Sequence, residues 1–141
     1  MHDETKGDRE NESDVVAFLI STWNLADQLK LAIPYGLDFA LIRKGHDICA
    51  FCEIKCRPGL SFGHGDGYYL ALQKVMRARE ITNETGLPCG LVVRFNDGTI
   101  ASVPMTDHRP GCIVAGREDR GRPSDREPHV VFPWEAFTVL S

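Results

Sequence analysis

The chain has 141 residues, 43% apolar and 26% charged, which suits one compact domain and excludes collagen-like and fully disordered classes. No apolar run approaches the roughly 20 residues of a membrane-spanning helix, and the start, Met1 to Glu4, is acidic, so we expect a cytoplasmic protein without membrane association. Residues 1–14 carry the whole formal charge of −4, and the other 14 acidic and 14 basic side chains balance, which excludes a strongly basic nucleic-acid binder but not an enzyme with a local basic channel.

The first segments are a polar tail and a helix. Residues 1–12 have no hydrophobic periodicity, so we expect a disordered acidic tail followed by a single domain over residues 13–141. Apolar residues then recur at steps of three and four from Val15 to Ile33, which predicts an amphipathic helix over residues 14–32. Ser13 or Asp14 is its expected N-cap, and Pro34 forces its end.

Two apolar runs follow, over residues 37–43 and 48–55, and a turn containing Gly45 separates them. This pattern predicts a β-hairpin. Because the runs are apolar at adjacent as well as alternate positions, we expect a sheet that is covered on both faces. The predicted fold class is therefore α/β, with a central mixed β-sheet and helices on both faces.

A glycine-rich loop follows over residues 58–67, and a second helix is expected at about residues 68–85, with Gly86 as its C-terminal stop. The loop could let a substrate backbone approach, with His64 and Asp66 near it, or it could be ordinary exposed polar sequence. Residues 91–95 and 99–103 flank Asn96-Asp97-Gly98 and predict a second hairpin. Residues 107–128 read as loop, and residues 129–137 as a short strand and a helical turn that docks Trp134 and Phe137.

The first hairpin brings charged residues together. With a turn at Gly45-His46, the numbers of paired residues sum to 91, so Asp38 faces Glu53. Lys55, two residues after Glu53, points to the same face. Two close carboxylates in a covered sheet need a cation between them, and their oxygens suit Mg²⁺ or Mn²⁺. A lysine beside a metal-activated water can stabilise the charge that develops during attack at phosphorus.

These residues and the order of elements around them resemble the PD-(D/E)xK nuclease superfamily, whose core is of the αβββαβ restriction-endonuclease type. The resemblance covers roughly residues 14–104. It implies that Asp38 and Glu53 bind the metal, that Lys55 helps to activate water, and that the protein is a nuclease whose substrate is nucleic acid, with DNA favoured. One departure is Leu37, where many members have proline before the aspartate.

The same resemblance suggests auxiliary residues. An acid on the first helix often completes such a site, which makes Glu12 a candidate beside Glu10 and Asp14, although charge favoured at a helix N-terminus also explains these residues. A glutamine on the helix after the lysine is used in some branches, and Gln73 stands there. Apart from the resemblance, the positions of Arg57, Lys74 and Arg77 make them candidates for contacts to phosphates, which would position a nucleic acid without specifying its sequence. Ordinary solvated side chains are the alternative interpretation of each.

Some segments also resemble small proteins carried by phages and prophages: residues 84–88, 91–98 and 116–121. This likeness gives a phage context but no activity. A homodimer is a further possible partner arrangement, since nucleases that cut both strands often pair.

Three other interpretations compete with the nuclease. Asp38, Glu53 and Lys55 could be exposed residues at strand ends that form an ordinary surface ion pair. The fold could be an inactive nuclease-like module for binding or assembly, which the acidic tail favours. A cysteine-ligated metal is the third, but Cys49 and Cys52 should point to opposite faces of a strand, so we expect all five cysteines to be reduced structural thiols.

Overall fold

The computed structural model describes residues 6–32, 35–106, 112–116 and 126–141. Two α-helices and nine strands are found there. In chain order the elements are α1 (Lys6–Thr22), β1 (Asp27–Lys30), β2 (Phe39–Ile42), β3 (Ile48–Cys56), β4 (Tyr68–Ala71), α2 (Leu72–Thr85), β5 (Cys89–Arg94), β6 (Ile100–Pro104), β7 (Cys112–Gly116), β8 (Arg126–Phe132), the 3₁₀ turn η4 (Trp134–Ala136) and β9 (Thr138–Val139).

The main sheet has six strands in the order β1-β2-β3-β5-β6-β9. Only β3 and β5 run parallel; the neighbouring pairs on either side are antiparallel. A parallel pair needs a crossover, and α2 lies on the connection from β3 to β5. The predicted α/β class with a mixed sheet is confirmed, and the order α1-β1-β2-β3-α2-β5 is the expected one apart from β4, which belongs to a second sheet.

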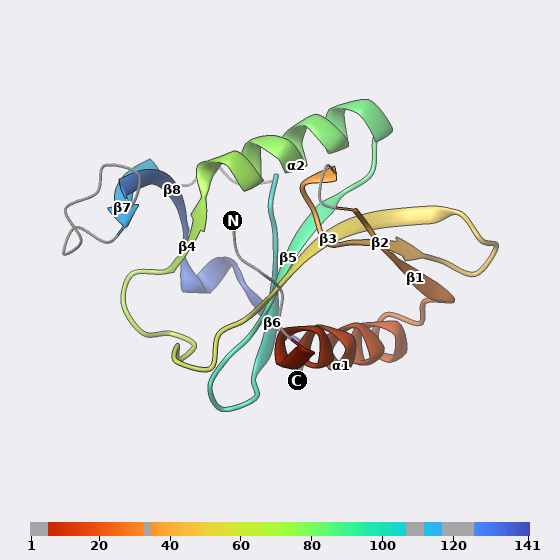
Figure 1. Cartoon of the computed structure of the whole chain (residues 1–141), viewed down its shortest axis with the longest axis horizontal. Coiled ribbons are helices and arrows are strands. Elements are labelled where there is room, and N and C mark those ends of the chain that lie inside the picture. The colour runs from red at the N-terminus through yellow and green to blue at the C-terminus, as the bar shows by residue number, and fades with distance from the viewer. Residues whose placement is uncertain (1–5, 33–34, 107–111, 117–125) are drawn as a thin grey trace.

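The two faces of the main sheet bury different helices (Figure 1). On one face, Val15, Val16 and Leu19 of α1 pack with Ile54 and Val92. The other face carries α2 and the second sheet, a three-stranded antiparallel sheet in the order β4-β8-β7. Because alternate strand residues point to opposite faces, each central strand must be apolar on both sides, as its sequence is.

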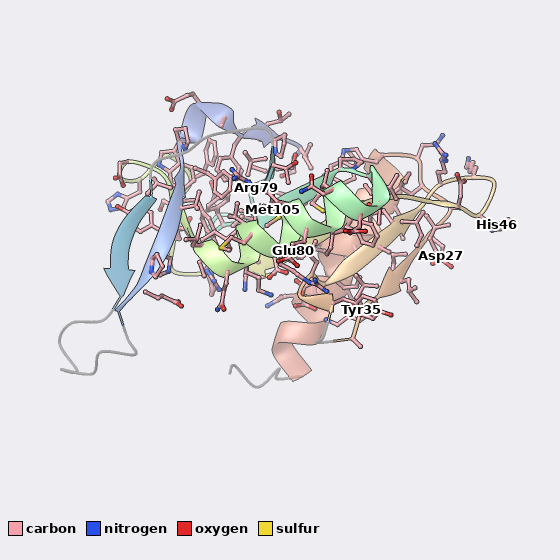
Figure 2. All side chains as sticks on the ribbon, turned by 90° about the horizontal axis from the view of Figure 1, so that it is seen from above. Asp27, Tyr35, His46, Arg79, Glu80 and Met105 are labelled. Atoms are coloured by element: carbon pink, nitrogen blue, oxygen red, sulfur yellow. The ribbon has the colours of Figure 1, made fainter. Side chains whose placement is uncertain are left out.

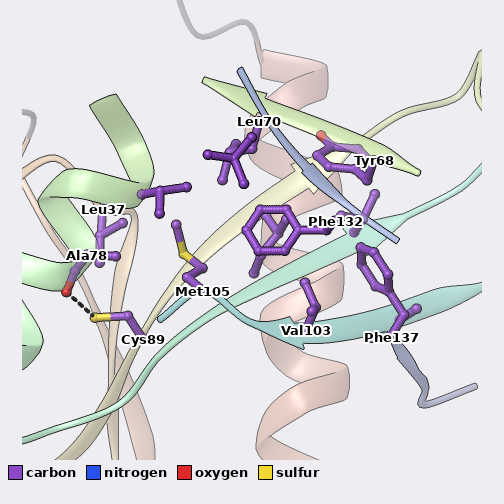
Figure 3. Packing of buried hydrophobic residues seen from close by; sticks show 14 of the residues in the cluster. Leu37, Tyr68, Leu70, Ala78, Cys89, Val103, Met105, Phe132 and Phe137 are labelled. Atoms are coloured by element: carbon purple, nitrogen blue, oxygen red, sulfur yellow. Dashed lines mark hydrogen bonds between the residues drawn. The ribbon is translucent and has the colours of Figure 1, made fainter. Parts of the chain in front are cut away.

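The core beneath α2 joins the two sheets. Phe132 of β8 and Met105 after β6 are fully buried there, and both lie at the centre of the cluster in Figure 3. Cys89 lies at the edge of the same cluster, where its thiol approaches the Ala78 carbonyl oxygen at 3.4 Å. This packing fixes α2 and β4 relative to β3 and β5.

The first hairpin has the predicted register. Phe39 pairs with Cys52 and Leu41 with Ala50, so the paired numbers sum to 91. Nearer the turn the register shifts at a bulge, and Ile42 pairs with Ile48. The turn uses positive φ angles of 109° at Gly45 and 69° at His46. Extending the register by one residue places Asp38 opposite Glu53.

The boundaries of the first predicted helix are wrong at both ends. Helix α1 begins at Lys6, within the segment expected to be a tail, and ends at Thr22 rather than residue 32. Asn24 adopts a left-handed φ of 53°, which ends the helix, and β1 follows as an edge strand that pairs with β2. Residues 1–5 and 33–34 lie outside the described residues.

The second sheet was not predicted. Residues 68–71 form β4 rather than the first turn of α2, residues 112–116 form β7 within the predicted loop, and β8 begins at Arg126 rather than His129. The remainder of that predicted loop, residues 107–111 and 117–125, lies outside the described residues.

Other predictions are confirmed. Gly86 ends α2 with a φ of 73°, and its N–H donates to the Thr82 carbonyl oxygen at 2.8 Å. Strands β5 and β6 form the second hairpin. The turn η4 packs Trp134 against Phe137, with ring centroids 5.6 Å apart. Neither helix, over the described residues, has the length and apolar character to cross a membrane.

Candidate active site

Glu53 is a charged side chain in an otherwise apolar strand interior. It lies on β3, and the residue is only 1% exposed. Its parallel neighbour in the sheet is Leu91 of β5, which belongs to the core beneath α2, so Glu53 faces the α2 side. The interpretation of Glu53 as an exposed surface residue is therefore wrong. A buried carboxylate is costly unless charged or polar groups compensate it.

Asp38 lies beside Glu53 because of the hairpin register. It directly precedes β2, and its carboxylate Oδ2 accepts a hydrogen bond from the Ile54 N–H at 2.9 Å. This bond fixes one carboxylate oxygen of Asp38 to the strand that carries Glu53. The two carboxylates are thus held by the backbone of adjacent strands rather than by a flexible loop.

Two lysines approach the buried carboxylate. Lys55 Nζ and Lys74 Nζ each lie 3.4 Å from Glu53 Oε2. Lys55 reaches it from the same strand, as the two-residue spacing predicts. Lys74 reaches it from the first turn of α2 and also donates to the Gly36 carbonyl oxygen at 2.9 Å. The lysine side chains are 27% and 33% exposed, so the group opens toward solvent on their side.

Burial and the neighbouring lysines act in opposite directions on the pKa of Glu53. Burial raises the pKa of Glu53 above its ordinary value, and the neighbouring Asp38 charge raises it further. Lys55 and Lys74 act in the opposite direction. The Cys52 thiol, next to Glu53 on the chain, also has a strongly raised pKa because it is buried and near both carboxylates. Cys52 is therefore held as a neutral thiol.

Comparison of the sequence with known protein families identifies the family of this chain. Residues 2–140 match the family described as "Phage putative PDDEXK endonuclease", which is nearly the whole chain. The chain belongs to this family. The resemblance to PD-(D/E)xK nucleases is thereby confirmed, and the phage context is the one that the family carries. No curated protein matches the chain.

The PDDEXK assignment agrees with the fold. The structure is similar to Hjc from Archaeoglobus fulgidus, a Holliday junction resolvase from an archaeal hyperthermophile, with a TM-score of 0.52 and 19% sequence identity. The match covers 72% of this chain and 74% of the resolvase chain. At this identity the likeness establishes a shared resolvase-like fold.

The auxiliary candidates of this PDDEXK chain lie apart from Glu53. Glu12 is on α1, where its carboxylate accepts from Lys30 Nζ at 2.6 Å. Lys30 in turn stands over the Phe39 ring, which belongs to the cluster on the α1 face, whereas Glu53 faces α2. Gln73 is exposed on α2, next to Lys74. Neither side chain has a described contact with Glu53 or Asp38.

The three phosphate-contact candidates have different surroundings. Lys74 turns inward to Glu53, a position that sequence reasoning missed, although a cation in the first turn of a helix is an unusual placement. Arg77 donates to the Tyr35 carbonyl oxygen and to the Glu80 carboxylate, each at 2.9 Å. Figure 2 labels Tyr35, in the segment before β2, and Glu80, on α2. Arg57 is exposed just beyond β3.

The residues present fit a hard divalent cation. Two carboxylates on adjacent strands supply oxygen ligands, and Mg²⁺ commonly binds through one or two carboxylates while it keeps several waters. The raised pKa of Glu53 shows that positive charge at this point would be favourable. A third carboxylate is missing: no group of three His, Cys, Asp or Glu side chains that could hold a metal occurs in the part of the chain described.

Within the segments that the structure describes, the cysteines form no such group either. Cys49, Cys52 and Cys56 all contact the apolar cluster on the α1 face, so the expected opposite orientation of Cys49 and Cys52 is wrong. The bulge in the hairpin accounts for this, because Leu41 pairs with Ala50 and Ile42 with Ile48, which leaves Cys49 between two ladder positions. Cys49, Cys52, Cys56 and Cys89 are free thiols.

Proposed function

We propose that this protein is a divalent-metal-dependent nuclease that hydrolyses phosphodiester bonds of DNA. Asp38 and Glu53 would hold a Mg²⁺ or Mn²⁺ ion, and Lys55 would position the attacking water. The support comes from the family, from the resolvase-like fold and from the geometry around Glu53.

The roles follow from where each group is fixed. The carboxylate of Asp38 is anchored by the Ile54 N–H, so it stays next to Glu53 without help from a ligand. Lys55 holds its ammonium at the solvent side of the buried carboxylate, where a water and a phosphate can approach. Its positive charge opposes the negative charge that grows on the phosphate oxygens during attack. A bound ion would lower the pKa of water and polarise the phosphate.

Lys74 adds a second positive charge beside Glu53. Its bond to the Gly36 carbonyl oxygen ties α2 to the segment just before Asp38. We infer that Lys74 is a positioning residue, which holds the Glu53 carboxylate ionised and in place.

One observation carries the proposal: a carboxylate that is 1% exposed lies beside a second carboxylate and 3.4 Å from two lysine ammonium groups. Stability alone does not explain this arrangement, because buried ion pairs often stabilise a fold less than apolar residues of similar volume would. Strained ionisable groups of this kind gather at functional sites.

The test is cleavage of a mixed panel of single-stranded, double-stranded and branched DNA with and without Mg²⁺. We expect the wild-type protein to cut at least one member only with metal, and Lys55→Ala to lose this cleavage while it keeps the fold. Lys44→Ala, which removes the same charge at the exposed β2–β3 turn, is the matched control and should cut as the wild type does. Cleavage by Lys55→Ala at the wild-type rate would refute the assignment.

A second function has one observation in its favour. Lys55 and Lys74 already neutralise Glu53, so the charge cluster can persist without a metal, as in a nuclease-like fold that serves for binding or assembly. This module would show no stabilisation by Mg²⁺ or Mn²⁺, whereas the nuclease must bind the ion in its folded state.

A further inference from the structure

A hollow of about 300 Å³ lies just beyond the end of β3, the strand that carries Glu53 and Lys55. It opens between the end of β3, the glycine-rich loop and the start of β4. Its walls are formed by Arg57, Leu60, His64, Asp66, Gly67, Tyr68 and Tyr69. Neither the proposed metal ligands nor Lys55 belong to this wall, so the hollow is a separate feature of the same surface.

The floor of the hollow holds a buried hydroxyl group beside Arg57. Tyr68 is 2% exposed, and its hydroxyl makes no hydrogen bond of normal geometry within the described residues, although Arg57 lies close enough to act on it. Burial raises the pKa of Tyr68, the nearby Glu53 charge raises it further, and Arg57 lowers it. Tyr68 is therefore a neutral donor that lies within electrostatic reach of both Arg57 and the active-site carboxylate. A buried polar group without a partner calls for a ligand or an ordered water.

Arg57 extends the line of cations on β3. The Arg57 N–H donates to the Arg94 carbonyl oxygen at 2.8 Å, so the ladder between β3 and β5 continues one residue beyond Cys56. Residues 53, 55 and 57 then point to one face, and successive members are about 6.7 Å apart along the strand. Lys55 and Arg57 thus present two cations on the face of the sheet that carries Glu53.

The loop wall of the hollow is rigidly held. A Cβ on Gly67 would lie 2.4 Å from the Phe132 carbonyl oxygen, so only glycine allows the loop to approach β8 this closely. Trp134 Nε1 donates to the carbonyl oxygens of His64 and Gly65, each at 3.1 Å. The hollow is therefore built into the fold before any ligand arrives.

We propose that this hollow binds the phosphodiester next to the scissile one in a nucleic-acid strand. Arg57 would pair with the phosphate, and the Tyr68 hydroxyl would donate to one of its oxygens. Asp66 accepts from the Tyr69 hydroxyl at 2.9 Å, which fixes the half-exposed Tyr69 ring at the rim as a surface on which a base can stack. The inference rests on the proposed nuclease function and names where its substrate strand is gripped.

The experiment measures binding of a short fluorescent single-stranded oligodeoxynucleotide by anisotropy, in EDTA so that no strand is cut. Tyr68→Phe removes only the hydroxyl, and we expect it to weaken binding about tenfold, the effect of one hydrogen bond to a charged group. Arg57→Gln should weaken binding to a similar extent. Lys44→Ala removes one positive charge in the exposed β2–β3 turn, the turn that Figure 2 marks with the His46 label, and should bind as the wild type does.

Urea unfolding of the same variants separates binding from stability. Because the Tyr68 hydroxyl makes no hydrogen bond of normal geometry within the described residues, and the Arg57 side chain beside it is exposed, Tyr68→Phe should be as stable as the wild type or more stable. Wild-type binding by Tyr68→Phe would overturn the inference, as would a loss of stability, since that would reveal a structural partner for the hydroxyl. If Lys44→Ala and Arg57→Gln lose the same amount of oligonucleotide affinity, the effect of Arg57 comes from net charge alone. That result would overturn the assignment of Arg57 to the hollow.

The two proposals fail separately. If Lys55→Ala cuts DNA normally but Tyr68→Phe binds poorly, the nuclease assignment of Lys55 is lost and the phosphate-binding hollow stands. If cleavage depends on Lys55 but Tyr68→Phe binds normally, the hollow alone is refuted.

Discussion

Glu53 shows how much one residue can indicate about function. Its neighbours along β3 are apolar, and an apolar side chain at this position would pack against the core beneath α2 without any need for compensation. Instead the chain supplies two lysines, one from the same strand and one from a helix that follows much later in the sequence. Compensation that includes a lysine from a separate helix is difficult to explain by folding alone, and a cation-binding role for the carboxylates explains it.

The raised pKa of Glu53 predicts how stability depends on pH. Below the ordinary value of 4.5, Glu53 is protonated in both the folded and the unfolded chain, so the folded state suffers no charge burial. Between pH 4.5 and the raised pKa of the folded state, the unfolded chain has lost the Glu53 proton while the folded chain still holds it. The contribution of Glu53 to stability therefore falls as the pH rises through this range, and it is lost above the raised pKa. In EDTA, the wild type should become progressively less stable relative to Glu53→Gln between pH 4.5 and neutral pH.

Urea unfolding of both proteins across this range checks the prediction. Asp27→Asn is a suitable control, because Asp27 is an exposed acid on β1 whose carboxylate accepts a local bond from the Gln28 N–H. The difference between Asp27→Asn and the wild type should not follow the same course. A constant difference between Glu53→Gln and the wild type would contradict the raised pKa.

Lys74 should influence Glu53 directly. Because its ammonium group lowers the pKa of Glu53, Lys74→Met should raise that pKa further, and carboxyl-carbon NMR of Glu53 measures this shift. We also expect Mg²⁺-dependent cleavage to fall about tenfold or more, as for other groups that stabilise charge in a preorganised site. Lys30→Met removes the same charge on the α1 face and should leave both quantities unchanged. An unmoved titration of Glu53 in Lys74→Met would refute the positioning role.

At the scale of elements, local signals were sufficient for some of the chain. The register of the first hairpin follows from two apolar runs around Gly45 and His46, and this register alone places Asp38 opposite Glu53. The second hairpin and the end of α2 followed from Asp97-Gly98 and Gly86 in the same way. In each case the deciding information lies within a few residues of the feature.

The missed elements depend on distant partners. Leu25 and Leu29 continue a helical spacing, but Asn24 ends the helix and β1 gains its hydrogen bonds from β2. Strand β4 pairs with β8, about sixty positions later, so residues 68–71 alone read equally well as the start of α2. Lys74 was assigned to phosphates for the same reason: its contact with Glu53 requires the crossover to be in place.

The close approach of the glycine-rich loop to β8 can be tested by adding one methyl group. In Gly67→Ala the new Cβ would meet the Phe132 carbonyl oxygen at 2.4 Å and Val131 Cγ1 at 2.9 Å. We expect a loss of about 1–3 kcal/mol in the free energy of unfolding, which is typical of overpacking. Gly59→Ala, in the same loop with nothing within 4 Å, should change little. Equal stabilities of the two variants by urea unfolding would contradict this packing.

At the scale of the whole molecule, the two faces of the main sheet differ in composition and in their proposed roles. The α1 face is an apolar cluster, with its ion pair between Glu12 and Lys30 at the margin. The other face carries α2, the second sheet, the carboxylates and the hollow. Chemistry is thus concentrated on the face where three separate segments of the chain meet, and binding there should stabilise the fold as a whole.

Metal binding is therefore expected as a shift in global stability. A ligand that binds only the folded state stabilises it by about 2.7 kcal/mol at a concentration one hundred times its Kd, so Mg²⁺ or Mn²⁺ should raise the Tm of the wild type. Asp38→Asn should abolish most of this rise, although its amide oxygen can still accept the Ile54 N–H and preserve the hairpin. Asp27→Asn, at an exposed site on β1, should keep the full rise. Scanning calorimetry with increasing metal concentration distinguishes the two functions. A Tm that does not respond in any of the three proteins would favour the binding module. A rise confined to the wild type and Asp27→Asn would locate the ion at Asp38.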